Sequence, residues 1–218
     1  MPTAIPDVRA TGPDWISTMK SQDLQAHWQF PGDLSDVARQ VLNLRPAEAY
    51  ERLVVRDGGN PEAKQALDRL RPEQLLTRPV RGADDAKCLL SGLWLWHDWL
   101  DRSHEISQSV HTPSGSYWHA IMHRREGDFS NAKYWYARCR HHPVLRDVAA
   151  RAEGILSRQD GARNLQHLIG DEWDADGFVD IVEAVHRKPE DPLYPAAVKL
   201  QRIEWQALFD HCARNAVG

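Results

Sequence analysis

The sequence has few cysteines, and their scarcity excludes a disulfide framework. Only three occur in 218 residues, Cys88, Cys139 and Cys212, and no two of them form a C-x-x-C pair. An odd number of widely spaced cysteines is typical of free thiols in a reducing compartment. We therefore expect a cytoplasmic protein stabilised by a hydrophobic core, which a chain of this length can form without cross-links.

Long apolar segments are also missing. The longest uninterrupted apolar run extends from Leu93 to Trp96, far short of the ~20 residues that a membrane-spanning helix needs. Residues 1–6 lack the basic region and apolar run of a secretory signal. We expect no membrane partner.

The chain carries no excess of positive charge. Its formal net charge is −4 and its isoelectric point is near 6.2, whereas general nucleic-acid binders are usually basic. We therefore expect no nucleic-acid partner. Glycine-rich phosphate loops, G-x-S-x-G elbows and Cys–His nucleophile patterns are absent as well, which leaves few familiar enzyme classes to consider.

Helical periodicity is what the sequence does contain, while alternating runs rich in β-branched residues are missing. In residues 84–108 the apolar side chains of Leu89, Leu93, Trp96 and Leu100 recur at helical spacing and predict one long helix. We predict a single all-α domain spanning residues 1–218, with 1–32 as a loosely structured arm. Further helices are expected at residues 14–28, 33–42, 47–55, 61–70, 72–76, 144–156, 161–170, 178–186 and 196–212.

Residues 115–143 predict two helices joined by a tight Gly-Asp turn and closed by proline. The small and aromatic residues Gly127, Ala132, Tyr136 and Cys139 resemble the second half of a tetratricopeptide repeat. The resemblance covers only one unit, and a repeat array needs at least about three stacked units to bury its faces. We therefore predict an irregular helical domain containing one repeat-like antiparallel hairpin, with a degenerate repeat array as the alternative.

The first group of ionisable residues lies within the predicted 84–108 helix. His97, Asp101, His104 and Gln108 fall in a sector of about 60° beside the apolar stripe. Asp101 and His104 are spaced to hold one metal ion together, or to let the carboxylate orient the imidazole as a proton carrier. The alternative is local pairing within the helix, which is the preferred interpretation for His97.

A second group follows in His119, His123 and Glu126. Two histidines at i and i+4 share a helix face and are suitable for binding a metal; the alternative is that they are buried and satisfied structurally. We take His104, His119, His123 and Glu126 as candidate catalytic residues. The candidate ligands of a divalent metal are Asp101, His104, His119 and His123.

Two arginines next to these histidines suggest an anionic substrate. The guanidinium groups of Arg124 and Arg125 suit a carboxylate or phosphate, although internal ion pairs with Glu126 or Asp128 are the alternative. The complete set of candidate substrate-binding residues is Trp118, Arg124, Arg125, Asn131 and Lys133.

A weaker possibility is a pair of metal ions. Glu183 and His186, with Asp101 and His104, resemble the carboxylate-x-x-His pairs of di-iron helical bundles. Such a bundle also needs two more carboxylates on long straight helices, for which Glu126 and Glu204 could be proposed.

One block of the sequence resembles a family of bacterial and fungal proteins whose activity is uncharacterised. The block comprises His104 to Gln108, Gly115 to Glu126, Asn131 to Trp135, and His142-Pro143. The resemblance implies no known activity, but it marks this block as the expected place for a site.

These patterns favour a small-molecule enzyme. We expect a polar pocket lined by histidine and tryptophan between the 84–108 helix and the 115–143 hairpin. Histidine acid/base or metal chemistry would act there on a small anionic substrate. The alternative is a non-catalytic, tetratricopeptide-like protein-interaction module.

Overall fold

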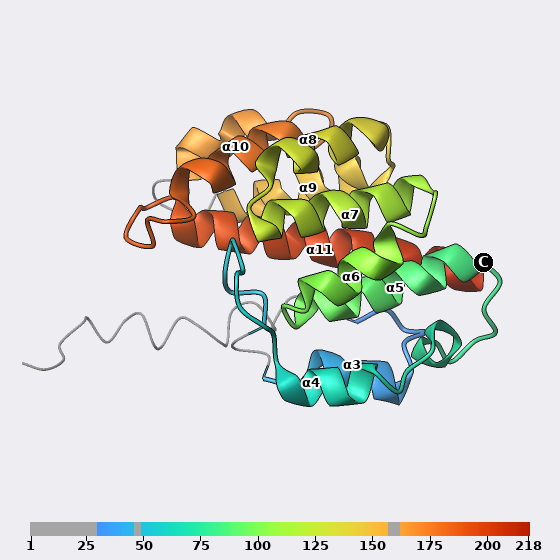
Figure 1. Cartoon of the computed structure of the whole chain (residues 1–218). Helices are drawn as coiled ribbons and strands as arrows, with labels where there is room; N and C mark the ends of the chain where they lie inside the picture. The colour runs from blue at the N-terminus through green and yellow to red at the C-terminus, as the bar shows by residue number, and fades with distance from the viewer. Residues whose placement is uncertain (1–29, 46–48, 157–161) are drawn as a thin grey trace, which may run out of the picture.

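The computed structural model describes residues 30–45, 49–156 and 162–218, and within these ranges the fold is all-α, as predicted (Figure 1). Outside the helices, these residues form only two isolated bridges, Leu34–Leu76 and Ile169–Trp173. The predicted helix at 14–28 and most of the predicted arm 1–32 lie outside the described residues. The helices are α3 (Asp36–Leu42), α4 (Pro61–Leu67), η1 (Pro72–Leu75), α5 (Ala83–Trp96), α6 (Leu100–Ser107), α7 (Pro113–Glu126), α8 (Phe129–Arg138), α9 (Val144–Leu156), η2 (Ala162–Leu168), α10 (Ala175–Val185) and α11 (Tyr194–Val217).

Side-chain caps define where five of these helices begin, namely α3, α4, α7, α8 and α10. Thr112 caps α7 by accepting the backbone N–H of Gly115, and Asp128 caps α8 by accepting that of Asn131. Between these helices Gly127 has a φ of 87°, a left-handed conformation that glycine adopts without steric cost. The predicted antiparallel hairpin is therefore present as α7 and α8.

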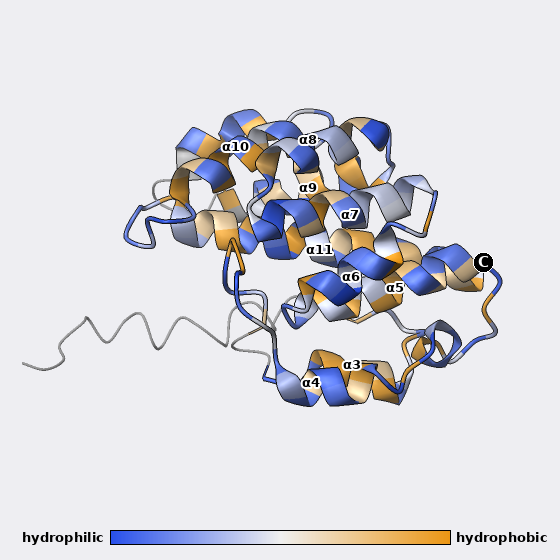
Figure 2. Ribbon diagram, in the orientation of Figure 1, coloured by the Kyte–Doolittle hydropathy of each residue, from blue (hydrophilic) through white to orange (hydrophobic). Residues whose placement is uncertain are grey.

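Helix α11 is the centre of the core. It packs against α5, α9 and α10, and Figure 2 shows hydrophobic residues concentrated where α5 and α11 meet. Trp205 of α11 stacks on Phe209 at 4.6 Å between ring centroids and lies 4.5 Å from Trp96 of α5. A helix that is buried on most sides needs such apolar residues around its circumference. The α3–α4 pair covers the outer side of α5, away from α8 (Figure 1).

The predicted single helix over residues 84–108 is wrong. Helix α5 ends at Trp96, Asp98 adopts a positive φ of 64°, and α6 starts at Leu100. The chain reverses there, so the Ser91 hydroxyl of α5 donates to the backbone carbonyl of Ser103 in α6 at 3.0 Å. His97, Asp101, His104 and Gln108 therefore do not share one helix face.

The helix predicted over residues 47–55 is also wrong for its described part, 49–55. Tyr50 has a positive φ of 59°, and the segment's backbone groups bond to other elements. Arg202 of α11 donates to the carbonyls of Ala49 and Tyr50, and Val55 donates to the carbonyl of Arg125. These tertiary bonds replace the i to i−4 bonds of a helix.

The remaining helix predictions are confirmed with small shifts of their boundaries. Helices occupy the expected positions of α3, α4, α9, α10 and α11, while the short helices expected at 72–76 and 161–170 are of the 3-10 type, η1 and η2. No described helix is both long and apolar enough to cross a bilayer. The domain prediction itself stays a prediction, because residues 1–29 are not described.

Candidate functional site

Three histidine side chains converge between α6 and α7. The ring centroid of His104 lies 4.7 Å from that of His119 and 5.4 Å from that of His123, and the last two are 4.6 Å apart. His119 and His123 are 3% and 6% exposed, whereas His104 is half-buried. Of the three rings, that of His104 is therefore the most accessible to solvent. The sequence correctly predicted that these three residues would meet.

The backbone brings the histidines together in two steps. His119 and His123 are four residues apart on α7, so their rings leave the same side of one helix. The reversal at Asp98 folds α6 back against α5, and this places α6 beside α7. Gly115 allows the tight entry into α7, because a Cβ atom there would lie 2.1 Å from the Val110 carbonyl oxygen.

Helix α8 supplies the wall of the cluster. The Trp135 ring stacks on His119 with 4.2 Å between centroids and an angle of 24° between planes. Asn131, one turn earlier on α8, places its amide nitrogen 3.1 Å from Nε2 of His123. Asn131 was among the predicted substrate-binding residues, whereas Trp135 was not predicted, although their i, i+4 spacing already places them on one side of α8.

The surroundings of the cluster keep the His119 ring uncharged. Burial is the main cause that lowers the pKa of His119 to about 3, and the neighbouring His123 and His104 contribute to the same shift. His119 is therefore neutral at pH 7 and keeps a lone pair on one ring nitrogen. Its Nδ1 atom is buried and has no hydrogen-bond partner among the described residues, an arrangement that costs free energy unless something occupies it.

The cluster has the composition of a metal site. One nitrogen from each of His104, His119 and His123 can be chosen so that all three lie within 4.8 Å of one another. Tetrahedral zinc with bonds of ~2.0–2.1 Å to nitrogen needs separations of about 3.3 Å, so the three rings would move closer together on binding it. The exposed Asp101 is not in this set, so the structure does not bring the fourth predicted ligand to it.

Glu126 joins the cluster through His123. Its carboxylate lies 2.5 Å from Nδ1 of His123, and its side chain is 41% exposed. A carboxylate on Nδ1 fixes the tautomer and leaves the lone pair on Nε2. The Asn131 amide lies against that nitrogen, so a metal ion bound there would displace Asn131. His123, Glu126 and Asp128 form a second, more exposed group of potential ligand atoms on the edge of the same site.

The two arginines are internal and do not face the cluster. Arg124 is fully buried, forms an ion pair with the fully buried Glu204, and donates to the Tyr136 hydroxyl at 2.6 Å. Burial alone would lower its pKa, but the Glu204 carboxylate outweighs burial and the pKa is raised. The alternative of an internal ion pair was therefore right in kind, although Glu204 was not among the expected partners.

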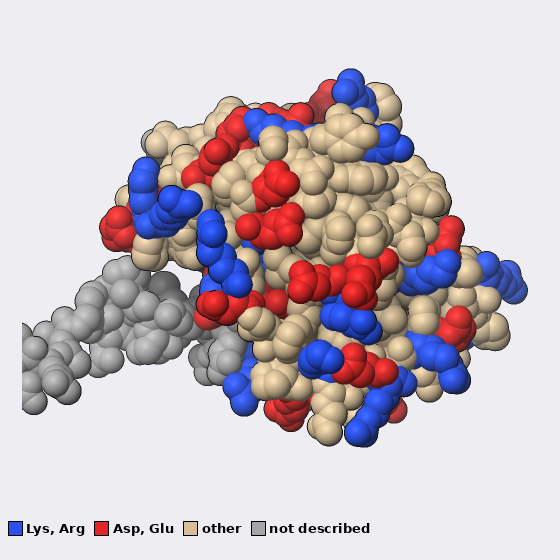
Figure 3. All heavy atoms as spheres, in the orientation of Figure 1, with Lys and Arg blue, Asp and Glu red and all other residues tan. Residues whose placement is uncertain are grey.

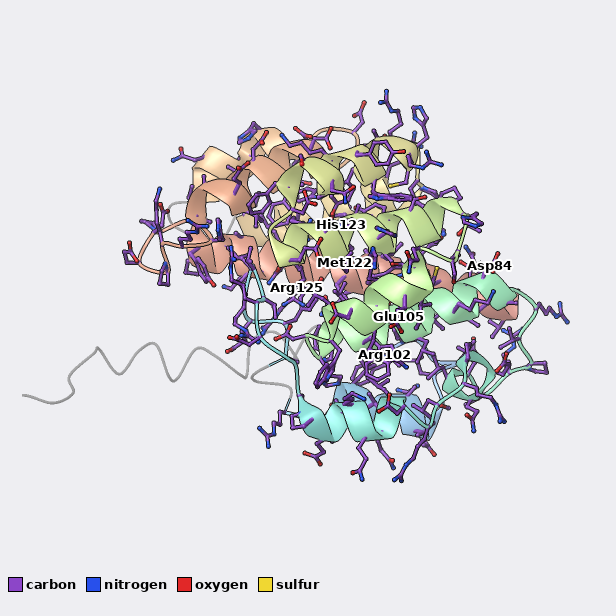
Figure 4. All side chains as sticks on the ribbon, in the orientation of Figure 1. Asp84, Arg102, Glu105, Met122, His123 and Arg125 are labelled. Atoms are coloured by element: carbon purple, nitrogen blue, oxygen red, sulfur yellow. The ribbon has the colours of Figure 1, made fainter. Side chains whose placement is uncertain are left out.

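Arg125 is likewise buried and is held by its own set of acceptors. It donates to Asp98 at 2.7 Å and to the backbone carbonyls of Leu95 and Arg52. His123 and Arg125, both labelled on α7 in Figure 4, contact different neighbours on different sides of the helix. Neither arginine is placed to bind an anion at the histidine cluster.

Two further predicted substrate-binding residues also lie elsewhere. Trp118 is completely buried against Trp205 in the core, with 5.9 Å between ring centroids. Lys133 forms an ion pair at 2.5 Å with Asp180 of α10 on the surface. These two residues hold helices together and do not reach the three histidines.

The second carboxylate-x-x-His pair does not join the first. Glu183 is exposed, His186 is bonded to backbone carbonyls of its own helix, and Asp180 is paired with Lys133. Glu204 is sealed in the core with Arg124. Within the described residues, the potential metal-binding groups include none of these side chains, so the di-metal arrangement is not formed.

His97 has a structural role, but the local pairing within its helix that was preferred for it is wrong, because its partner lies 56 residues away. Its Nε2 is 2.8 Å from the Val41 carbonyl, and the residue caps the end of α5.

Across the face shown in Figure 3, acidic and basic side chains are interspersed around a broad uncharged area over α7 and α8.

No family model, curated protein or solved structure matches this chain. The resemblance to bacterial and fungal proteins therefore stays a prediction, and the site has to be interpreted from its own geometry.

Proposed function

We propose that the chain is a metal-dependent enzyme whose His104, His119 and His123 bind one divalent cation, with zinc as the best-suited ion. The observation that carries the proposal is the convergence of three imidazoles, two of them buried, with ligand atoms within 4.8 Å. Neutral imidazole is a preferred zinc ligand, and catalytic zinc sites keep three protein ligands and one open position.

The open position would face solvent on the His104 side, because His104 is the least buried of the three. A cation there would lower the pKa of a bound water or polarise a substrate oxygen, which suits hydrolysis of a small ester or related compound. Glu126 would orient His123 and is exposed enough to accept a proton. Trp135 would fix the His119 ring and line the entrance.

The metal part of the proposal is tested by zinc binding to chelator-treated protein. Calorimetry should detect one zinc ion per chain, and His119→Ala or His123→Ala should weaken binding by roughly 100-fold or more. His141→Ala is the matched control, because His141 is exposed and outside the cluster. Failure to bind zinc, or equal affinity in all variants, would overturn the proposal.

The enzymatic part needs a separate assay. We expect the zinc-loaded protein to hydrolyse an activated ester or phosphoester, such as 4-nitrophenyl acetate or 4-nitrophenyl phosphate, and a chelator to abolish the reaction. Glu126→Gln should lower kcat by roughly 100-fold if its carboxylate carries the proton. Zinc binding without turnover of any such compound would restrict the function to metal binding.

A non-catalytic interaction module remains the second candidate, and one observation favours it. Tyr134, on the outer side of the α7–α8 hairpin, is 57% exposed and is the large hydrophobic residue that stands out on the described surface. Tyr134→Ala should leave zinc binding unchanged in either case. Loss of a protein partner with retention of zinc affinity would support the interaction module.

A further inference from the structure

A hollow lies where the segment after α3 passes the α5–α6 junction, and it is separate from the proposed metal site. It encloses about 360 Å³, within the range of small-molecule sites. Its wall is polar and is formed by three separate parts of the chain. The polar residues that line it include Arg45, Glu51, Arg52, Asn60 and Asp98.

Among the described residues beside this hollow, cationic groups outnumber anionic groups. Asp98 is shared by two guanidinium groups, those of Arg125 at 2.7 Å and Arg52 at 2.9 Å. Arg202, only 6% exposed, donates to backbone carbonyls, and its carboxylate partner Glu51 is 4.0 Å away. Among the described residues, the guanidinium groups of Arg52, Arg125 and Arg202 are therefore matched by two carboxylates, with Arg125 and Arg202 buried and Arg52 exposed.

The lowered pKa of the Arg202 guanidinium agrees with this excess of positive charge. Burial lowers the pKa of its guanidinium, Glu51 acts in the opposite direction, and the positive charge of Arg125 lowers the pKa further. An incompletely compensated charge away from water costs free energy unless a counter-charge lies near it. An anion in the hollow would supply that counter-charge.

The loop that forms one wall is fixed before any ligand arrives. A Cβ atom on Gly59 would lie 1.8 Å from the His97 carbonyl oxygen, so only glycine fits. The next residue, Asn60, donates its backbone N–H to that carbonyl at 3.1 Å and caps α4 with its side-chain oxygen. The Asn60 side-chain NH₂ group is buried without a partner in the described part of the chain, which leaves a donor beside the hollow.

We propose that this hollow binds the phosphate or carboxylate group of a small soluble molecule. Arg52, whose side chain is 46% exposed, makes the direct charged contact. The Asn60 amide provides a second donor, and the buried Arg125 and Arg202 contribute the positive field. The volume leaves room for an organic part beyond the anionic group.

Calorimetry with the full-length protein tests the proposal. Inorganic phosphate, glycerol 3-phosphate and succinate are titrated at constant ionic strength, with sodium chloride as the blank. At least one oxyanion should bind with a stoichiometry of one, and Arg52→Gln should weaken it by tenfold or more. Arg69→Gln, a change at an exposed arginine outside the hollow, should leave the affinity unchanged.

A second variant acts in the opposite direction. Glu51→Gln removes a carboxylate from the rim and should tighten oxyanion binding several-fold, because it increases the cationic surplus. This variant decides the question if Arg52→Gln fails to fold by circular dichroism. Preference for the phosphates or for succinate identifies the chemical class. Absence of all oxyanion binding, or affinities that neither substitution changes, overturns the proposal.

Discussion

Buried polar residues avoid unpaired charge in two different ways. Arg124 keeps its charge and lies against Glu204, whereas His97 and His142 lose theirs. Burial lowers the pKa of both histidines to about 4, and a neighbouring His211 acts in the same direction on His142. His142 accepts the backbone N–H of Val144 at Nδ1 and has Nε2 beside the Ser114 hydroxyl. Both ring nitrogens of the neutral imidazole therefore have a hydrogen-bond partner.

Because these two histidines are neutral in the folded protein, we predict that acid destabilises the protein at pH values well above the pKa of its carboxyl groups. An unfolded histidine has a pKa near 6.5. As the pH falls from about 6.5 to 4, the unfolded chain therefore takes up protons that the native state does not. The free energy of unfolding should be constant above pH 7 and fall across this window, by on the order of 3 kcal/mol per histidine.

Urea denaturation at pH 7, 5.5 and 4 measures this effect. His97→Gln should reduce the pH dependence by the contribution of one histidine, since glutamine does not titrate, whereas His141→Gln at an exposed position should leave it unchanged. Parallel pH profiles for His97→Gln and the unmodified protein would contradict the assignment.

Individual residues also show how much of the candidate site could be predicted from the sequence. The i, i+4 spacing of His119 and His123 predicted their meeting, because it depends only on helix geometry. His104 was also predicted, but on the assumption of one long helix, whereas it reaches α7 through the α5–α6 reversal. The burial of Arg124 in an ion pair depends on Glu204, 80 residues further along the chain. No local sequence pattern could have predicted this pairing.

At the scale of helices, glycine has opposite effects at two positions. Gly127 ends α7 with a φ of 87°, whereas Gly154 lies inside α9 with open space around it. Alanine at 127 must adopt a left-handed conformation that costs roughly 1–2 kcal/mol. Alanine at 154 should instead stabilise the helix by roughly 0.5–1 kcal/mol.

Thermal unfolding of Gly127→Ala and Gly154→Ala should therefore shift Tm in opposite directions. The two variants carry the same chemical change, so each is the control for the other. A Gly127→Ala protein as stable as Gly154→Ala would show that the end of α7 does not require the left-handed conformation.

Helix boundaries could be predicted where residues close in the sequence determine them, and could not be predicted elsewhere. The Gly127-Asp128 turn combines a left-handed glycine with a side-chain cap, and both are visible in the sequence. The break at Asp98 has no such signal, because Leu93 and Leu100 continue the helical spacing through it. Its positive φ is held by Arg52 and Arg125, which are distant in the sequence, so tertiary contacts decide the local structure.

For the molecule as a whole, Glu204 is a junction between three helices. From α11 its carboxylate accepts the hydroxyls of Tyr117 in α7 and Tyr136 in α8, both at 3.0 Å, and pairs with Arg124. All of these groups are buried. The hairpin that carries the histidine cluster is thereby fixed to the central helix.

Neutralising this junction should destabilise the entire fold. Glu204→Gln leaves the Arg124 charge buried and unpaired, which costs roughly 3–5 kcal/mol and should lower Tm by roughly 10 °C for a chain of this size. Glu190→Gln, at an exposed position, is the control. The double variant Arg124→Met with Glu204→Gln should recover part of the loss, and a double variant less stable than Glu204→Gln would contradict this account.

The histidine cluster is assembled from one short stretch of chain. His104, His119, His123 and Trp135 all lie within residues 104–135, and only the reversal and hairpin around them must close to bring them together. Short loops cost little entropy to close, and contacts of low sequence separation form quickly. We therefore expect the cluster to assemble early in folding, before α11 joins the core. A cation bound at that stage would act as a folding nucleus for the α6–α8 region as well as a ligand of the finished protein.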